Sequence, residues 1–169
     1  MSDNLTIDKN KSEEEIYIQM LSQIETLINQ NEPIISNLSN VTAALKEAFD
    51  KISWVGFYLV KKDALYLGPF QGKTACSFIK LGSGVCGTSA KKRETIIVDD
   101  VNEFPGHIAC DSGSKSEIVI PIISDDKLIG VLDVDSYNLS AFNKNDKFYL
   151  EKIACILVRK LPLSEFTLL

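Results

Sequence analysis

The residues best suited to chemistry in this sequence are its cysteines, Cys76, Cys86, Cys110 and Cys155. The thiolate, rather than the thiol, is the nucleophile and the metal ligand, so a reactive cysteine has surroundings that favour the charged form. A cysteine without such surroundings more often packs as a small apolar side chain. The neighbours of each cysteine therefore decide whether it is a candidate for redox chemistry.

Cys110 lies in a long stretch, residues 99–115, that shows neither a helical nor a strand period. Loops of this length are uncommon inside compact domains and are often functional. His107 and Lys115 are basic residues close to Cys110 in the sequence, and both favour its thiolate. Cys110 is therefore a candidate reactive cysteine.

Cys86 lies in a glycine-rich bend, residues 82–87, at the expected start of a short helix that runs through Lys92. Helix N-termini carry partial positive charge and stabilise thiolates, which makes Cys86 a second candidate. Cys76 precedes the same segment. Cys155 lies in the last expected helix and is interpreted as a spectator.

Three carboxylates are expected to meet across a pair of strands. On the expected strand at residues 127–135, Asp133 and Asp135 share one face, because alternate residues of a strand point the same way. If the expected strand at 116–123 pairs with it as a hairpin, Glu117 lies near both aspartates. Buried like charges at this distance need a cation or must keep a proton.

Two aromatic residues, Trp54 and Tyr58, share a face of another expected strand, residues 54–60. Beside the carboxylates they would form a site for a small cation. An ammonium group fits, because aromatic rings add cation–π attraction, whereas they offer no ligands to a hard metal ion. Two plainer interpretations stay open: the carboxylates line a solvated edge, and the aromatic rings form a second core layer.

The spacing of Cys76, Cys86, His107 and Cys110 matches no compact zinc pattern, so no metal is expected. His107 is the single histidine. A Cys–His hydrolase stays open, although the two residues are three positions apart in one loop, unlike typical dyads.

Helical spacing of apolar residues predicts two N-terminal helices and one C-terminal helix. Ser12 and Glu15 form a capping box for the first helix, Pro33 opens the second, and Asn143 with Asp146 caps the last. The strands expected between them are residues 54–60, 64–67, 77–80, 95–98, 116–123 and 127–135. This order predicts an α+β fold in which an antiparallel sheet carries helices on one side.

Alternation along three of these strands predicts which residues face the core. The core-facing residues are Val55, Phe57, Leu59, Ile118, Ile120, Ile122, Leu128, Gly130, Leu132 and Val134. The residues with polar tips alternate with them and gather on the opposite face of the sheet.

The chain has 169 residues, which suits one domain over residues 1–169 with a loose tail at 1–11. The net charge of -5 disfavours nucleic-acid binding, which needs clustered basic residues. No apolar run is long enough to span a membrane, and the polar N-terminus lacks a signal-peptide core. A cytoplasmic protein is therefore expected, in which structural disulfides are rare.

Six segments of the sequence together resemble one known family. They are residues 54–58, 67–73, 84–88, 104–111, 116–119 and 130–135, which read WVGFY, LGPFQGK, GVCGT, FPGHIACD, SEIV and GVLDVD. The sequence resembles the GAF-domain free methionine-(R)-sulfoxide reductases over roughly residues 53–156. The resemblance implies a GAF-like fold, with two N-terminal helices and one C-terminal helix on one side of the sheet and an active-site loop region on the other.

The resemblance also assigns roles to residues. It implies that Cys110 is the catalytic cysteine and that Cys86 and Cys76 are resolving cysteines. It implies that the substrate is contacted by Trp54, Tyr58, Glu117, Asp133 and Asp135. A homodimer is suggested only by analogy with other GAF domains.

The implied reaction reduces free methionine sulfoxide. The Cys110 thiolate attacks the substrate sulfur, and Glu117 or one of the aspartates donates a proton. Cys110 becomes a sulfenic acid, Cys86 condenses with it to a disulfide, and a thioredoxin-type donor supplied by NADPH restores the thiols. No bound cofactor is needed.

Two other functions stay open. A non-enzymatic GAF module would bind a small ligand without turnover. A redox switch would oxidise Cys86 and Cys110 with peroxide and would ignore methionine sulfoxide.

Overall fold

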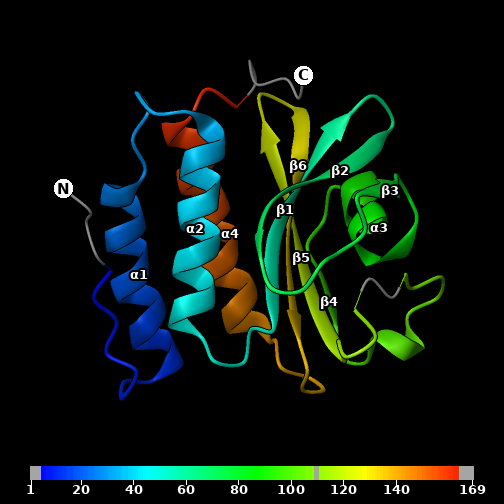
Figure 1. The fold of residues 1–169 in the computed structure, drawn as a ribbon, viewed down its shortest axis with the longest axis horizontal. Helices are drawn as coiled ribbons and strands as arrows, with labels where there is room; N and C mark the ends of the chain where they lie inside the picture. The colour runs from blue at the N-terminus through cyan, green and yellow to red at the C-terminus, as the bar shows by residue number, and fades with distance from the viewer. Residues whose placement is uncertain (1–4, 109–110, 164–169) are drawn as a thin grey trace.

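The computed structural model describes residues 5–108 and 111–163. In the described residues, one sheet lies between a layer of helices on one side and a shorter helix with loops on the other (Figure 1). The helices are α1 (Glu13–Leu27), α2 (Ile34–Ala48), α3 (Gly84–Lys92) and α4 (Lys144–Lys160), and a short 3-10 helix covers Val101–Glu103. The strands are β1 (Trp54–Lys61), β2 (Ala64–Gln71), β3 (Phe78–Lys80), β4 (Ile96–Val98), β5 (Ser116–Ser124) and β6 (Lys127–Ser136).

The strands form one six-stranded antiparallel sheet in the order β3-β2-β1-β6-β5-β4. Strands β1 and β6, which are far apart in the sequence, pair with each other at the centre of the sheet. The predicted α+β class and antiparallel sheet are confirmed, and each expected strand is present with ends that differ by a few residues.

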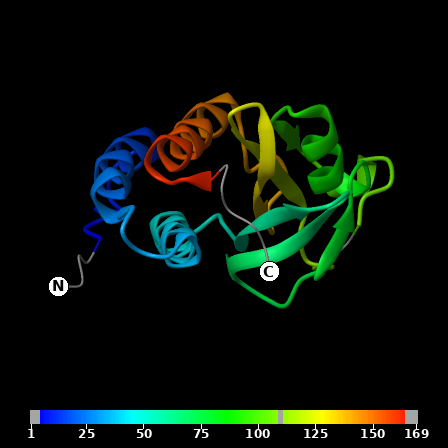
Figure 2. The ribbon, with the colours of Figure 1, turned by 90° about the horizontal axis from the view of Figure 1, so that it is seen from above.

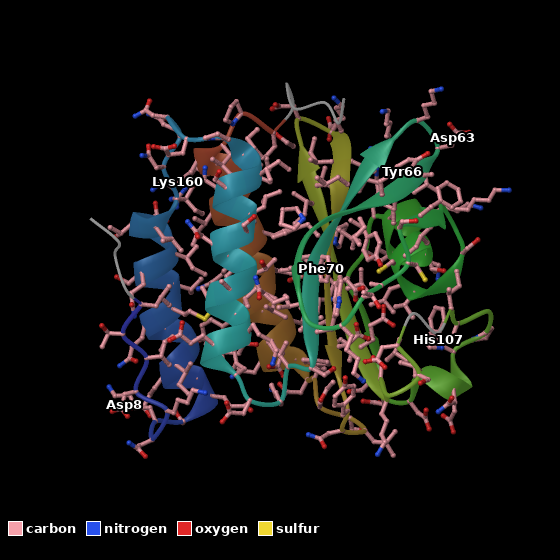
Figure 3. All side chains as sticks on the ribbon, viewed as in Figure 1. Asp8, Asp63, Tyr66, Phe70, His107 and Lys160 are labelled. Atoms are coloured by element: carbon pink, nitrogen blue, oxygen red, sulfur yellow. The ribbon has the colours of Figure 1, made fainter. Side chains whose placement is uncertain are left out.

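Three helices cover one face of the sheet, and the other face carries α3 and the long loop (Figure 2). Helices α2 and α4 pack on the strands, while α1 packs on α2 and α4 as an outer layer. Side chains fill the space between these helices and the sheet (Figure 3). The predicted arrangement, with helices on one side and the loop region on the other, is confirmed.

The ends of the helices follow the predicted capping patterns. Ser12 and Glu15 form the capping box of α1, and Asn143 and Asp146 form that of α4. Asp146 is buried and also accepts a hydrogen bond from the Tyr17 hydroxyl of α1 at 2.9 Å. The cap of α4 therefore also joins α4 to the outer helix.

The main core lies between the helices and the sheet. The predicted core-facing residues that belong to it are Val55, Phe57, Leu59, Ile118, Ile120, Ile122, Leu132 and Val134. Trp54 and Tyr58 belong instead to a second, smaller cluster on the opposite face, together with Val119 and Val131. The alternation along β1 therefore places one set of side chains in the main core and the other set on the opposite face of the sheet, where a site can form.

The prediction for Leu128 is wrong. Leu128 packs against the second cluster, whereas its neighbour Ile129 lies in the main core. The pairing of β5 with β6 shifts register between Ile122 and Ile123, opposite this point. A bulge of this kind interrupts strict alternation, and the sequence carries no signal for it.

The long loop, residues 99–115, contains only the 3-10 helix among its described residues. Its two ends are tied to the sheet, because the Val101 amide donates to the Lys115 carbonyl at 2.9 Å and the Lys115 amide donates to the Ser136 carbonyl at 2.8 Å. The loop therefore leaves and rejoins the sheet at the site face. Among the described residues, no helix has the length and apolar character required to cross a membrane.

Candidate active site

The β5–β6 hairpin brings the three predicted carboxylates together. Glu117 pairs directly with Asp135, and Asp133 pairs with Val119 two residues further along. Glu117 and Asp133 are buried, on the face of the sheet away from the main core. The predicted convergence of these carboxylates is confirmed.

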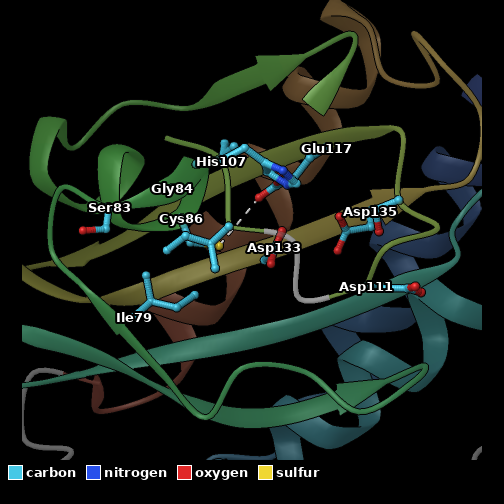
Figure 4. A pocket seen from close by; sticks show the side chains of 12 residues that line it. Ile79, Ser83, Gly84, Cys86, His107, Asp111, Glu117, Asp133 and Asp135 are labelled. Atoms are coloured by element: carbon cyan, nitrogen blue, oxygen red, sulfur yellow. Dashed lines mark hydrogen bonds between the residues drawn. The ribbon is translucent and has the colours of Figure 1, made fainter. Parts of the chain in front are cut away.

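These carboxylates line a cavity beneath the N-terminal end of α3 (Figure 4). Cys86 from α3 and His107 from the long loop complete its wall. Asp133 and Asp135 also line an adjoining cavity together with the two predicted aromatic residues, Trp54 and Tyr58. All the described residues predicted to contact substrate therefore border one of these two cavities.

Burial raises the pKa of each carboxyl group, so the group keeps its proton to a higher pH. Removal from water, followed by repulsion from Asp133 and Asp135, holds the pKa of Glu117 well above its usual range. Burial and the Asp133 charge likewise raise the pKa of Asp135. Burial raises the pKa of Asp133 to about 6. The cluster therefore retains protons near neutral pH, and Glu117 is suited to proton donation.

One oxygen of the cluster lacks a hydrogen-bond partner. Asp133 Oδ1 is buried and receives no hydrogen bond. A buried carboxylate oxygen without a donor is unfavourable, so this atom favours a bound donor or cation. The possible ligand atoms of Asp133, Glu117 and Cys86 lie within 4.8 Å of one another. Among the residues that the structure describes, this group could hold a metal ion.

The expectation of a stabilised thiolate at Cys86 is wrong. Cys86 is buried in the first turn of α3, and its thiol donates a weak hydrogen bond to Glu117 Oε1 over 3.8 Å. Burial, and then the negative charges of Asp133 and Glu117, raise the pKa of this thiol well above its ordinary value. The partial positive charge of the helix N-terminus does not offset these two effects, the removal of the thiol from water and the repulsion from nearby carboxylates.

The aromatic wall is built on β1. The Trp54 ring stacks on Tyr58 with centroids 6.0 Å apart and on Phe70 with centroids 5.5 Å apart. Gly56 lies beneath, and a Cβ at this position would overlap the Trp54 ring and the Phe70 side chain. Trp54 Nε1 donates to the Lys73 carbonyl at 3.0 Å, which fixes the ring plane.

Tyr58 and the cysteines define the other wall. The Tyr58 hydroxyl donates to the Cys76 carbonyl at 3.0 Å, so β1 positions the segment that carries Cys76. Cys76 is disulfide-bonded, whereas Cys86 and Cys155 are free thiols. Cys155 is exposed on α4, on the far side of the sheet from the cavities. Cys110, the predicted catalytic cysteine, lies outside the described residues.

Asp111 and Ser114 are among the cavity residues that were not singled out from the sequence. Asp111 lines both cavities, and Ser114 lines the first and hydrogen-bonds Asp135, which lowers the pKa of that carboxyl in part. Asp111 directly follows Cys110 in the segment FPGHIACD, so its place in that motif could have marked it. Ser114 had no such signal, because the irregular loop has no period from which to place its side chains.

The chain belongs to the GAF domain family, whose model matches residues 36–156. Among its relatives, GAF domain-containing protein A of Dictyostelium discoideum is 51% identical and spans 93% of this chain and 99% of that protein. A Saccharomyces cerevisiae protein named free methionine-R-sulfoxide reductase is 45% identical over 90% of this chain and 89% of its own length.

A solved structure gives the same picture. The X-ray structure of free methionine-R-sulfoxide reductase from Neisseria meningitidis in complex with its substrate superposes with a TM-score of 0.90. The two sequences are 44% identical, and the match covers 95% of this chain and 96% of that chain. The family resemblance drawn from the six sequence segments is therefore confirmed.

Proposed function

We propose that this protein is an oxidoreductase that reduces free methionine-R-sulfoxide to methionine. The observation that carries the proposal is the cluster of buried Glu117 and Asp133 with half-buried Asp135, in cavities that Trp54 also borders, on a chain 45% identical to a reductase of that name. The R stereochemistry follows from the names of the relatives rather than from the cavity.

The cavities are suited to a small zwitterion. The carboxylates of Asp133 and Asp135 would hold the substrate ammonium, and the Trp54 and Tyr58 rings beside them add cation–π attraction. Backbone N–H groups of the 82–88 bend or of the 106–116 loop would hold the substrate carboxylate. A site that binds both charged ends excludes methionine sulfoxide within a polypeptide.

The reaction begins at Cys110. Its thiolate attacks the sulfoxide sulfur, Glu117 protonates the oxygen, and the oxygen passes to Cys110 as a sulfenic acid while methionine leaves. The raised pKa of Glu117 supports this role, because the group must carry a proton at neutral pH. The cysteine sulfur is oxidised by two electrons and the substrate sulfur is reduced by two.

Cys76 is the better candidate to attack the sulfenic acid first. It is half-buried and disulfide-bonded, whereas Cys86 is buried, free and has a raised pKa. Attack by the Cys76 sulfur on the Cys110 sulfenic acid forms a disulfide, and the departing hydroxyl takes up the proton of the Cys76 thiol and leaves as water. Cys86 would then act as a second resolving cysteine by thiol–disulfide exchange.

The disulfide is returned to thiols by a dithiol protein of the thioredoxin type, which takes its electrons from NADPH, so no bound cofactor is required. We place this chemistry in the cytoplasm, where such donors keep thiols reduced. A homodimer, and one domain over residues 1–169 with a tail at 1–11, complete the proposal.

A thioredoxin-coupled assay that follows NADPH oxidation tests the function. It compares free methionine-R-sulfoxide, the free S form and an N-acetylated, amidated R form. We expect turnover of the free R form alone, abolished by Cys110→Ser and retained in Cys155→Ser. If no form is reduced with thioredoxin or with dithiothreitol, the protein is better described as a GAF ligand sensor.

A further inference from the structure

Three side chains meet at the rim of the cavities, and we call Lys73, Asp111 and Tyr137 the rim cluster. The Tyr137 hydroxyl donates to Asp111 Oδ2 at 2.7 Å. Lys73 Nζ lies 3.4 Å from the same carboxylate and 5.0 Å from the centroid of the Tyr137 ring. Asp111 thus has two partners from outside its own loop.

Each of the two partners follows a strand of the sheet in the sequence. Tyr137 directly follows β6, whose last residue Ser136 pairs with Ser116 of β5. Lys73 follows β2, and its carbonyl accepts the hydrogen bond from Trp54 Nε1. The rim cluster therefore attaches the irregular loop to the same strands that carry the cavity carboxylates and the aromatic wall.

The loop is shaped to receive the Tyr137 ring. Asp111 Oδ1 accepts the Gly113 N–H at 2.9 Å, and the Asp111 carbonyl accepts the Ser114 N–H at 3.1 Å, which closes a tight turn. The Tyr137 ring packs on this turn so closely that a Cβ on Gly113 would lie 2.9 Å from Tyr137 Cε1.

The exposure of Tyr137 separates this role from core packing. Its side chain is 40% exposed, so it contributes little to either hydrophobic cluster. What it does contact is Asp111, the residue that lines both cavities and directly follows Cys110 in the sequence.

We propose that Tyr137 is a positioning residue, which holds Asp111 and the turn at residues 111–114 in place as the rim of the substrate cavities. The inference rests on the proposed function, because its effect on turnover requires Cys110 to be the nucleophile. Tyr137 borders neither cavity, so it acts through Asp111 and the turn on which its ring packs.

The first test is Tyr137→Phe, which keeps the ring and removes the hydroxyl. We expect methionine release in a single turnover without reductant to slow by about fivefold, the effect of one lost hydrogen bond. The melting temperature should stay near that of the wild-type protein, because the side chain is largely at the surface. Tyr66→Phe is the matched control, since Tyr66 is 39% exposed on β2 and borders neither cavity.

A double-mutant cycle with Asp111→Ala tests whether Tyr137 acts through Asp111. We expect Tyr137→Phe to have no further effect on methionine release in the Asp111→Ala background, because the hydrogen-bond acceptor is already gone. If the two substitutions slow release by independent factors, Tyr137 does not act through Asp111 and the inference is overturned.

Hydrogen exchange separates failure of this inference from failure of the proposed function, because it needs no turnover. We expect the Gly113 and Ser114 amides to exchange faster in Tyr137→Phe than in wild type or Tyr66→Phe, since their acceptor Asp111 is less well held. Unchanged exchange overturns the inference even if the enzyme is inactive. Normal methionine release by Tyr137→Phe overturns it while leaving the reductase function intact.

Discussion

The carboxylates of the site are unusual because the fold places them where they resist ionisation. Glu117 and Asp135 lie opposite each other on neighbouring strands, and Asp133 lies beside them. Burial raises the pKa of each, and their mutual repulsion adds to the effect for Glu117 and Asp135. In the proposed reaction this arrangement supplies both a proton donor and a negative site for an ammonium group.

Glu117→Gln tests the proton donor. The amide is similar in shape but cannot deliver a proton, so methionine release should slow by about 100-fold or more, the usual worth of a general acid. KM for free methionine-R-sulfoxide should change much less. Single-turnover methionine release measures the effect, and Glu47→Gln, an exposed change on α2, is the control. Near-normal release by Glu117→Gln would assign the proton to an aspartate instead.

At the scale of elements, strand alternation accounts for most of what could be predicted. The faces of β1 were predictable because three apolar residues, Val55, Phe57 and Leu59, stand at alternate positions and share one face. The meeting of Glu117 with the two aspartates was predictable in outline, because the two strands read as a hairpin and their polar residues share a face. The exact pairing of Glu117 with Asp135 was not, because it depends on the register shift between Ile122 and Ile123; the turn register alone would place Glu117 opposite Val134.

The failures at this scale have physical causes that a local pattern does not contain. The side of the sheet taken by Leu128 depends on a bulge in its own strand, where Ile129 has no partner on β5. The raised pKa of Cys86 depends on burial, and then on carboxylates that are more than thirty residues away in the chain. The rim contacts of Asp111 depend on Tyr137 and Lys73, which no motif or period connects with it.

Gly56→Ala tests how β1 supports the aromatic wall. The added methyl group would overlap the Trp54 ring and displace it, because Phe70 closes the other side. Overpacking of this kind should lower the free energy of unfolding by about 1–3 kcal/mol. KM for free methionine-R-sulfoxide should also rise, because Trp54 no longer borders the cavity correctly. Urea unfolding and steady-state kinetics check both effects, and a variant with wild-type values for both would contradict this account of Gly56.

At the scale of the whole molecule, one face of the sheet carries the main core and the other carries the candidate site. The main core between the sheet and the helices contains most of the buried apolar side chains. The smaller cluster on the other face shares its space with Glu117 and Asp133, whose burial opposes folding. The main core therefore stabilises a fold that the site alone would weaken.

The pH dependence of stability should reveal this opposition. The folded protein binds more protons than the unfolded chain between about pH 4 and pH 6, because Asp133 has a pKa of about 6 when folded. The free energy of unfolding should therefore fall as pH rises through this range, and the raised pKa values of Glu117 and Asp135 extend the fall to higher pH.

Asp133→Asn should flatten this profile and make the protein more stable than wild type at pH 7.5, by at most about 3 kcal/mol. Urea unfolding at pH 5 and pH 7.5 measures the slope. Asp63→Asn, in the exposed turn between β1 and β2, is the control and should leave the slope unchanged. Equal slopes in Asp133→Asn and wild type would show that Asp133 ionises as freely in the folded protein as in the unfolded chain.

The pairing of β1 with β6 also governs when the site can form during synthesis. Trp54 pairs with Asp135, so the site needs a strand that leaves the ribosome some eighty residues after β1 begins. Until then one edge of β1 stays open, and open edges are where nascent chains associate wrongly. The centre of the sheet, which sets the aromatic residues of β1 beside the aspartates of β6, therefore forms only after β6 has been synthesised.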